Sequence, residues 1–111
     1  MSQLDFFDSE EYGRIPFWEN YLVCQAVQAS LGRYPPHATA IGIEVKGRNA
    51  IFHFQMPYAS QEDEEEMLDI LDEFETIAEV EVHVSRHIAI RSERQTAPSD
   101  GVTWIYLSRT K

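Results

Sequence analysis

The sequence predicts an α+β fold, a two-layer sandwich in which two helices cover one face of a four-stranded, mainly antiparallel sheet. Two segments repeat apolar residues at the 3.6-residue period of a helix. Three others alternate apolar and polar residues, as half-buried strands do, and a fourth strand near the end of the chain is apolar on both faces. The expected order is helix, two strands, helix, two strands. A chain of 111 residues is expected to form one domain, residues 1–111.

The first helix is expected over Phe17–Leu31. Pro16 suits its first position, because the N–H that proline lacks would have no partner there. Gly32 can adopt the left-handed conformation that commonly ends a helix. The stripe expected to face the sheet consists of Leu22, Val23, Ala26, Val27, Ser30 and Leu31. The acidic and aromatic residues 1–14 are expected to pack as a short helical turn.

The remaining elements follow from alternation and turn residues. Strands are expected over Ala38–Lys46 and Ala50–Met56, joined as a hairpin by a short Gly-Arg-Asn turn. After the second helix, residues 80–91 alternate without a break and predict one long strand. A polar loop leads to a last strand over Val102–Arg109. Its two apolar faces predict a central strand, or one whose second face meets a partner.

The second helix, Ser60–Glu79, is the most distinctive part of the chain. Ser60 is a candidate N-cap, and an apolar stripe faces the core: Met67, Ile70, Leu71, Phe74, Ile77 and Ala78. The other face consists almost entirely of carboxylates, and no Lys or Arg occurs between Asn49 and Ser85. Like charges one turn apart each destabilise an isolated helix by a few tenths of a kcal/mol. A merely solvated face is one interpretation. A surface for a cationic partner is the interpretation that we favour.

The residues expected to bind such a partner lie on this helix and just before it. Aromatic anchors among carboxylates combine desolvated contact area with electrostatic steering, so Tyr58 and Trp18 are candidate anchors. The expected binding residues are Tyr58, Glu62, Asp63, Glu65, Glu66, Asp69, Asp72 and Glu73.

Composition narrows the class of partner. A net charge of −10 argues against direct binding to nucleic acid or to an anionic membrane, because both need cationic side chains. A basic protein is the expected partner. The single cysteine, Cys24, excludes an internal disulfide, and its apolar helix predicts a buried, inert thiol. The acidic start and the lack of a long apolar run predict a cytoplasmic protein.

Motifs of catalysis are not found in the sequence. It contains no glycine-rich phosphate loop, GxSxG elbow or HExxH pair, so we expect no enzymatic activity, no cofactor and no metal site. His83 and His87 would project from one side of the third strand, about 13 Å apart, too far to share a metal. They are expected to face solvent, and His53 is expected at the surface or at a sheet edge. An enzyme or sensor that uses His83, His87 and Arg91 is a minor alternative.

The acidic run EDEEEMLDILDEFE, the −10 charge, the small size and the lack of catalytic motifs resemble one broad class. It comprises the small acidic immunity proteins of bacterial toxin systems, such as contact-dependent inhibition and colicin-type nucleases. The resemblance implies tight one-to-one binding to a toxin domain, often a nuclease, through carboxylates that occupy its cationic groove.

A second hypothesis comes from a different functional class. The chain would be a homodimeric structural or assembly module that uses the doubly apolar last strand and the helices. The acidic face would then only keep the protein soluble.

Overall fold

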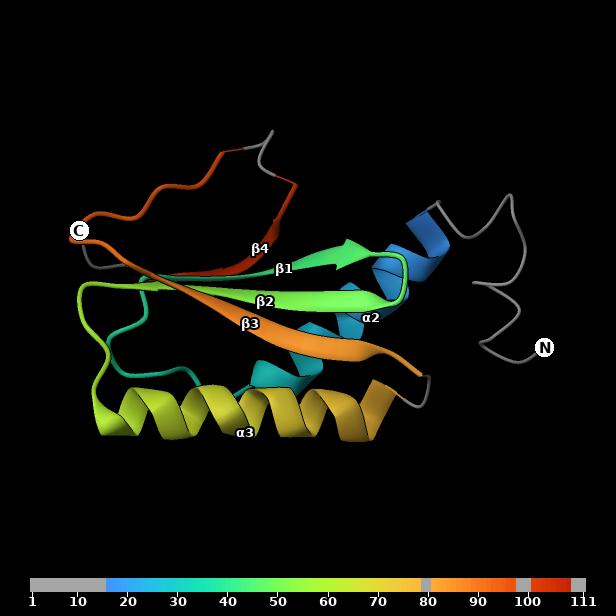
Figure 1. Cartoon of the computed structure of the whole chain (residues 1–111), viewed down its shortest axis with the longest axis horizontal. Coiled ribbons are helices and arrows are strands. Elements are labelled where there is room, and N and C mark those ends of the chain that lie inside the picture. Colours follow the sequence, from blue (N-terminus) through green and yellow to red (C-terminus); the bar gives the residue numbers. More distant parts are fainter. Residues whose placement is uncertain (1–15, 79–80, 98–100, 109–111) are drawn as a thin grey trace.

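The computed structural model describes residues 16–78, 81–97 and 101–108 (Figure 1). Its elements are α2 (Pro16–Ser30), β1 (Ala40–Lys46), β2 (Asn49–Met56), α3 (Gln61–Ala78), β3 (His83–Ile90) and β4 (Thr103–Leu107). The predicted order of helices and strands is confirmed. The helical turn expected within residues 1–14 lies outside the described residues. No helix in the described ranges is both long and apolar enough to cross a membrane.

The four strands form one mixed sheet in the order β3-β2-β1-β4. β1 pairs antiparallel with both β2 and β4, whereas β2 and β3 run parallel. Parallel neighbours need a crossover connection, and α3 provides it. In Figure 1, α3 lies on one side of the strands and the segment after β3 lies on the other.

The core lies between the sheet and the helices. Alternate side chains of β1 and β2 point to the helical layer and are fully buried: Ile41, Ile43, Phe52, Phe54 and Met56. They form one cluster with Trp18, Leu22, Met67, Ile70 and Phe74 from the helices. The rings of Phe52 and Phe74 meet edge to face, with centroids 5.1 Å apart. Each such side chain contributes roughly 1.5–3 kcal/mol by leaving water, so this layer holds the helices on one face of the sheet.

β4 lies at an edge of the sheet, so the predicted central position is wrong. Its two apolar faces have separate explanations. Tyr106 stacks on Tyr34 on the helical side, with ring centroids 4.1 Å apart. Trp104 is paired with Gly42 of β1 and belongs to the opposite face, which we call the open face.

Gly42 allows Trp104 to lie against the open face. A Cβ atom built at Gly42 would lie 2.5 Å from Cγ1 of Val102 and 2.7 Å from Cε3 of Trp104. Both distances are below van der Waals contact, so only glycine fits beneath these side chains. The register between β1 and β4 also shifts beside Gly42, a local irregularity that re-aims the β4 side chains.

We predict that Gly42→Ala lowers the free energy of unfolding by about 1–3 kcal/mol, because the methyl group overpacks this contact. Chemical denaturation followed by circular dichroism measures the change. Ser85→Ala, on the exposed part of β3, is the control and should change stability by less than about 0.5 kcal/mol. Equal stability of the Gly42→Ala and wild-type proteins would contradict the packing described for Trp104.

Candidate functional site

The outward side of α3 presents five exposed carboxylates, which we call the acidic face: Glu62, Glu65, Asp69, Asp72 and Glu75. Two more of the predicted binding residues, Glu66 and Glu73, are half-buried along one flank. Among the described residues, two arginines form ion pairs with carboxylates of α3. Arg33 lies 3.8 Å from Glu73, and Arg86 lies 2.9 Å from Glu64. Neither of these arginines pairs with the acidic face, and among the described residues no ion pair reaches its carboxylates.

Leu68 lies within the acidic face and is 50% exposed. Helical geometry places it between Glu65, three residues earlier, and Asp72, four residues later. The sequence analysis missed this residue because Leu68 falls outside the buried stripe. The sequence feature that could have identified Leu68 is a large apolar residue at a helical position that faces away from the core. An exposed leucine surrounded by carboxylates provides apolar contact area inside a charged surface.

Asp63 does not belong to the acidic face, so its predicted exposure is wrong. Its side chain is fully buried at the start of α3. It accepts hydrogen bonds from the backbone N–H groups of His37 (2.9 Å) and Ser60 (2.8 Å). The Ser60 hydroxyl donates to Asp63 at 2.8 Å and accepts from the Asp63 N–H at 3.1 Å. This reciprocal capping fixes the first turn of the helix.

The same carboxylate ties the start of α3 to the loop after α2. The Nδ1 atom of His37 lies 2.7 Å from Oδ2 of Asp63. Burial alone would raise the pKa of Asp63, but the hydrogen bonds from His37 and Ser60 outweigh burial and lower the pKa from 3.8 to about 2. Asp63 is therefore ionised at neutral pH and acts as a structural link.

Tyr58 is held at the end of this hydrogen-bond chain. In the neutral ring of His37, when Nδ1 donates to the ionised Asp63, Nε2 accepts from the Tyr58 hydroxyl, 2.8 Å away. The Tyr58 side chain is still 56% exposed. The structure therefore presents an exposed, positioned aromatic ring beside the first turn of α3. Trp18 is different: it is 2% exposed and donates from Nε1 to the carbonyl of Gly47, so its predicted role as an anchor is wrong.

The open face brings together two histidines that lie far apart in the sequence. The parallel register aligns His53 of β2 with His87 of β3, and their ring centroids lie 5.4 Å apart. His53 is half-buried on an inner strand, so its predicted place at the surface or at a sheet edge is wrong, and its Nε2 lies 2.8 Å from Oε1 of Glu44. The hydrogen bond with His53 lowers the pKa of Glu44 against the opposing effect of burial. His83 and His87, considered together in the sequence, do not meet.

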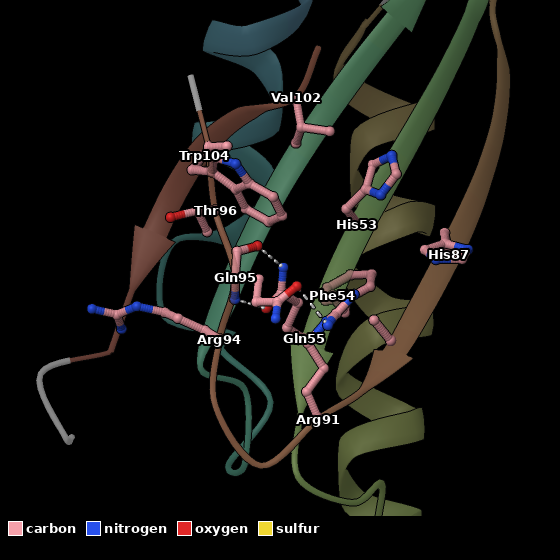
Figure 2. Close-up of a pocket in the computed structure, with 12 residues that line it drawn as sticks. His53, Phe54, Gln55, His87, Arg91, Arg94, Gln95, Thr96, Val102 and Trp104 are labelled. Carbon is pink, nitrogen blue, oxygen red and sulfur yellow. Dashed lines mark hydrogen bonds between the residues drawn. The ribbon is translucent and has the colours of Figure 1, made fainter. Parts of the chain in front are cut away.

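A cavity of about 600 Å³ lies over these histidines, beneath the segment that follows β3 (Figure 2). His53, His87, Arg91 and Trp104 line it. The sequence analysis missed the site because it depends on the parallel pairing of β2 and β3 and on the path of the segment after β3. Neither leaves a local sequence pattern.

Cys24 is exposed on the outer side of α2, so the predicted buried thiol is wrong. Val27 and Leu31 follow at helical spacing on the same side and are 40% and 56% exposed. The expected apolar stripe of this helix is therefore divided. Leu22, Ala26 and Ser30 face the core, whereas Cys24, Val27 and Leu31 form a second, outward stripe.

Within the described ranges, no three His, Cys, Asp or Glu side chains are grouped to hold a metal ion. Comparison of the chain with family models, curated proteins and solved structures finds no match.

We predict that Asp63→Asn lowers the free energy of unfolding at pH 7 by about 2 kcal/mol, because a lowered pKa measures the stabilisation of the ionised form. In the wild-type protein this stabilisation is present above pH 4 and is lost as the pH falls through about 2. Urea titrations between pH 7 and pH 2 should show a smaller acid-induced loss in Asp63→Asn. The exposed Asp69→Asn is the matched control. If the free energy of unfolding depends on pH in the same way in the wild-type and Asp63→Asn proteins, the structural role described for the ionised Asp63 is wrong.

Proposed function

We propose that this chain is a binding protein that engages a basic protein partner through the acidic face of α3. The observation that carries the proposal is the exposed Leu68 within carboxylates that no described cation pairs with. Apolar contact area inside a charged rim is typical of protein interfaces.

Electrostatics supports a cationic partner. Carboxylates one turn apart on α3 repel one another, and lysines or arginines of a partner would relieve that repulsion. Complementary charge also speeds the encounter of two proteins, whereas a few desolvated contacts slow their release. Leu68 and Tyr58 would provide those contacts. Tyr58 is already held by His37, so binding would cost little side-chain entropy at this position.

A toxin inhibitor is the specific form of this function that we propose. α3 has 18 residues and is therefore about 27 Å long. An acidic helix of that length would lie along the cationic groove of a nuclease-type toxin, in place of the phosphate backbone of the nucleic acid that such a toxin cleaves. The resemblance to small acidic immunity proteins supports the same proposal.

The charge of α3 provides the direct test. The tagged chain is used to isolate a stoichiometric basic partner from a lysate of its own cells at low salt, and affinity is then measured by calorimetry. We predict that Glu65→Lys/Asp72→Lys weakens binding by about tenfold or more, because two attractions become repulsions. Leu68→Ser should also weaken binding, with little effect on its salt dependence.

The matched control is Glu81→Lys/Glu93→Lys, which changes the net charge equally at exposed positions away from α3. If both double variants lose affinity equally, only net charge matters and the acidic face is not the binding surface. If neither loses affinity, the proposed function is wrong.

The outer side of α2 favours a second candidate function, a homodimeric assembly module. In a two-fold symmetric dimer the same stripe of each subunit faces its copy, and the stripe of Cys24, Val27 and Leu31 carries no charge. Cys24 lies near the middle of α2, where the axis of an antiparallel helix pair would pass.

This candidate predicts a dimer that resists dilution in sedimentation experiments and that a mild oxidant cross-links through Cys24. Leu31→Glu should give monomers, because it places a carboxylate in the helix contact. Leu68→Glu is the matched control on α3 and should leave the dimer intact. A monomeric wild-type protein at all concentrations would exclude this candidate without affecting the proposal for α3.

A further inference from the structure

The cavity over the open face is built by a segment held above the sheet. The side-chain amide of Gln55 donates to the carbonyl of Gln95 at 2.7 Å and accepts from the N–H of Gln95 at 2.8 Å. Arg94 donates from Nη1 to the carbonyls of Thr39 (3.2 Å) and Ser108 (2.7 Å). These contacts fix the segment at two places, so the space beneath it is part of the fold.

Aromatic rings line the cavity across three strands. The ring of Trp104, from β4, meets the ring of His53 edge to face, with centroids 6.3 Å apart. His53 in turn contacts the ring of His87. Glu44 binds one nitrogen of His53 and thereby fixes its orientation. A flat ligand ring would find here a wall of side chains already in place (Figure 2).

The charge of the cavity is opposite to that of the protein. The chain has a net charge of −10, yet the described lining residues include two arginines, two histidines and no Asp or Glu. Arg94 is used by the backbone contacts described above. Among the residues that the structure describes, the guanidinium of Arg91 donates one hydrogen bond, from Nη1 to Oε1 of Gln95 at 2.9 Å, and a guanidinium has further donors.

His87 and Arg91 share one face of the third strand and its continuation, with only the small side chain of Ala89 between them. Among the described residues, the ring of His87 has no hydrogen-bond partner, and it meets the ring of His53. The open space above Ala89 thus lies between two groups that can donate hydrogen bonds to an acid.

We propose that this cavity binds a small organic anion with a planar ring, whose acid group is held by His87 and Arg91 and whose ring lies against Trp104 and His53. The volume of about 600 Å³ is that of an ordinary small-molecule site. Bidentate contact with arginine is a usual way of holding carboxylate and phosphate groups. The acid group is therefore a phosphate or a carboxylate, and the experiment distinguishes these two.

This site is independent of the function proposed for α3. The helix covers one side of the sheet, and the cavity lies on the other. The Glu65→Lys/Asp72→Lys protein should therefore bind the anion as the wild type does, even if it fails to bind a protein partner.

The test uses four compounds that separate the ring from the charge. Phenyl phosphate and benzoate carry both on the same ring, phenol carries the ring alone, and inorganic phosphate carries the charge alone. Each is titrated into the ¹⁵N-labelled full chain, and amide and indole N–H chemical shifts are followed. We expect saturable shifts around Trp104, His53 and Gln95 at about 1 mM or below with at least one of the first two compounds, and much weaker effects with the others. The stronger of the first two identifies the acid.

The decisive variant is His87→Gln/Arg91→Gln, which should weaken binding about tenfold or more because it removes the positive charge and bidentate fork of Arg91 and the imidazole N–H of His87. Both residues are exposed, so the fold should persist, and the unchanged spectrum of α2 and α3 checks this. The matched control is His83→Gln/Arg48→Gln, which removes the same residue types outside the cavity and should bind within about twofold of the wild type. The proposal is overturned if neither of the two compounds that carry both ring and charge gives saturable chemical-shift changes. Equal affinity of the decisive variant and the wild type would also overturn it, as would equal binding of phenol and phenyl phosphate.

Discussion

The parallel pairing of β2 with β3 is the constraint on which the rest of this structure depends. Parallel neighbours cannot be joined by a tight turn, so the chain must run back along one face of the sheet between the end of β2 and the start of β3. α3 forms this crossover connection. The crossing gives α3 one side for the core and leaves the other for solvent. The same pairing aligns His53 with His87 on the opposite face of the sheet. One backbone arrangement therefore creates both an acidic protein surface and a small cavity of opposite charge.

The carboxylates of α3 serve two purposes that their sequence spacing does not distinguish. Asp63 is buried, ionised and bonded to His37 and Ser60, so it holds the helix start and the positioned ring of Tyr58. The outward carboxylates destabilise the helix slightly through mutual repulsion, and packing of the apolar stripe offsets this. A protein that keeps such repulsion around an exposed Leu68 has a surface suited to a cationic partner.

Much of this fold could be predicted from the sequence because its patterns are local. The repeat period of the apolar residues and the positions of turn residues predicted both helices and all four strands. The apolar residues of α3 that lie in the core all belong to its predicted stripe. The errors came from long-range contacts. Trp18 is buried because α2 runs beneath the β1–β2 turn, where Gly47 offers a carbonyl. Asp63 is buried because the loop holding His37 reaches the helix start, and β4 lies at an edge because β1 already pairs with β2. The cavity required the path of the Gln95 segment, which periodicity does not reveal.

The central claim is that the acidic face of α3 contacts a basic partner, and zero-length cross-linking tests it most directly. A carbodiimide joins a carboxylate to a lysine only where the two are in contact, and mass spectrometry identifies the joined residues. In the isolated complex, this account predicts cross-links from Glu62, Glu65, Asp69 or Asp72 to lysines of the partner. Cross-links confined to Glu81 or Glu93, which are equally exposed but lie off the helix, would contradict it.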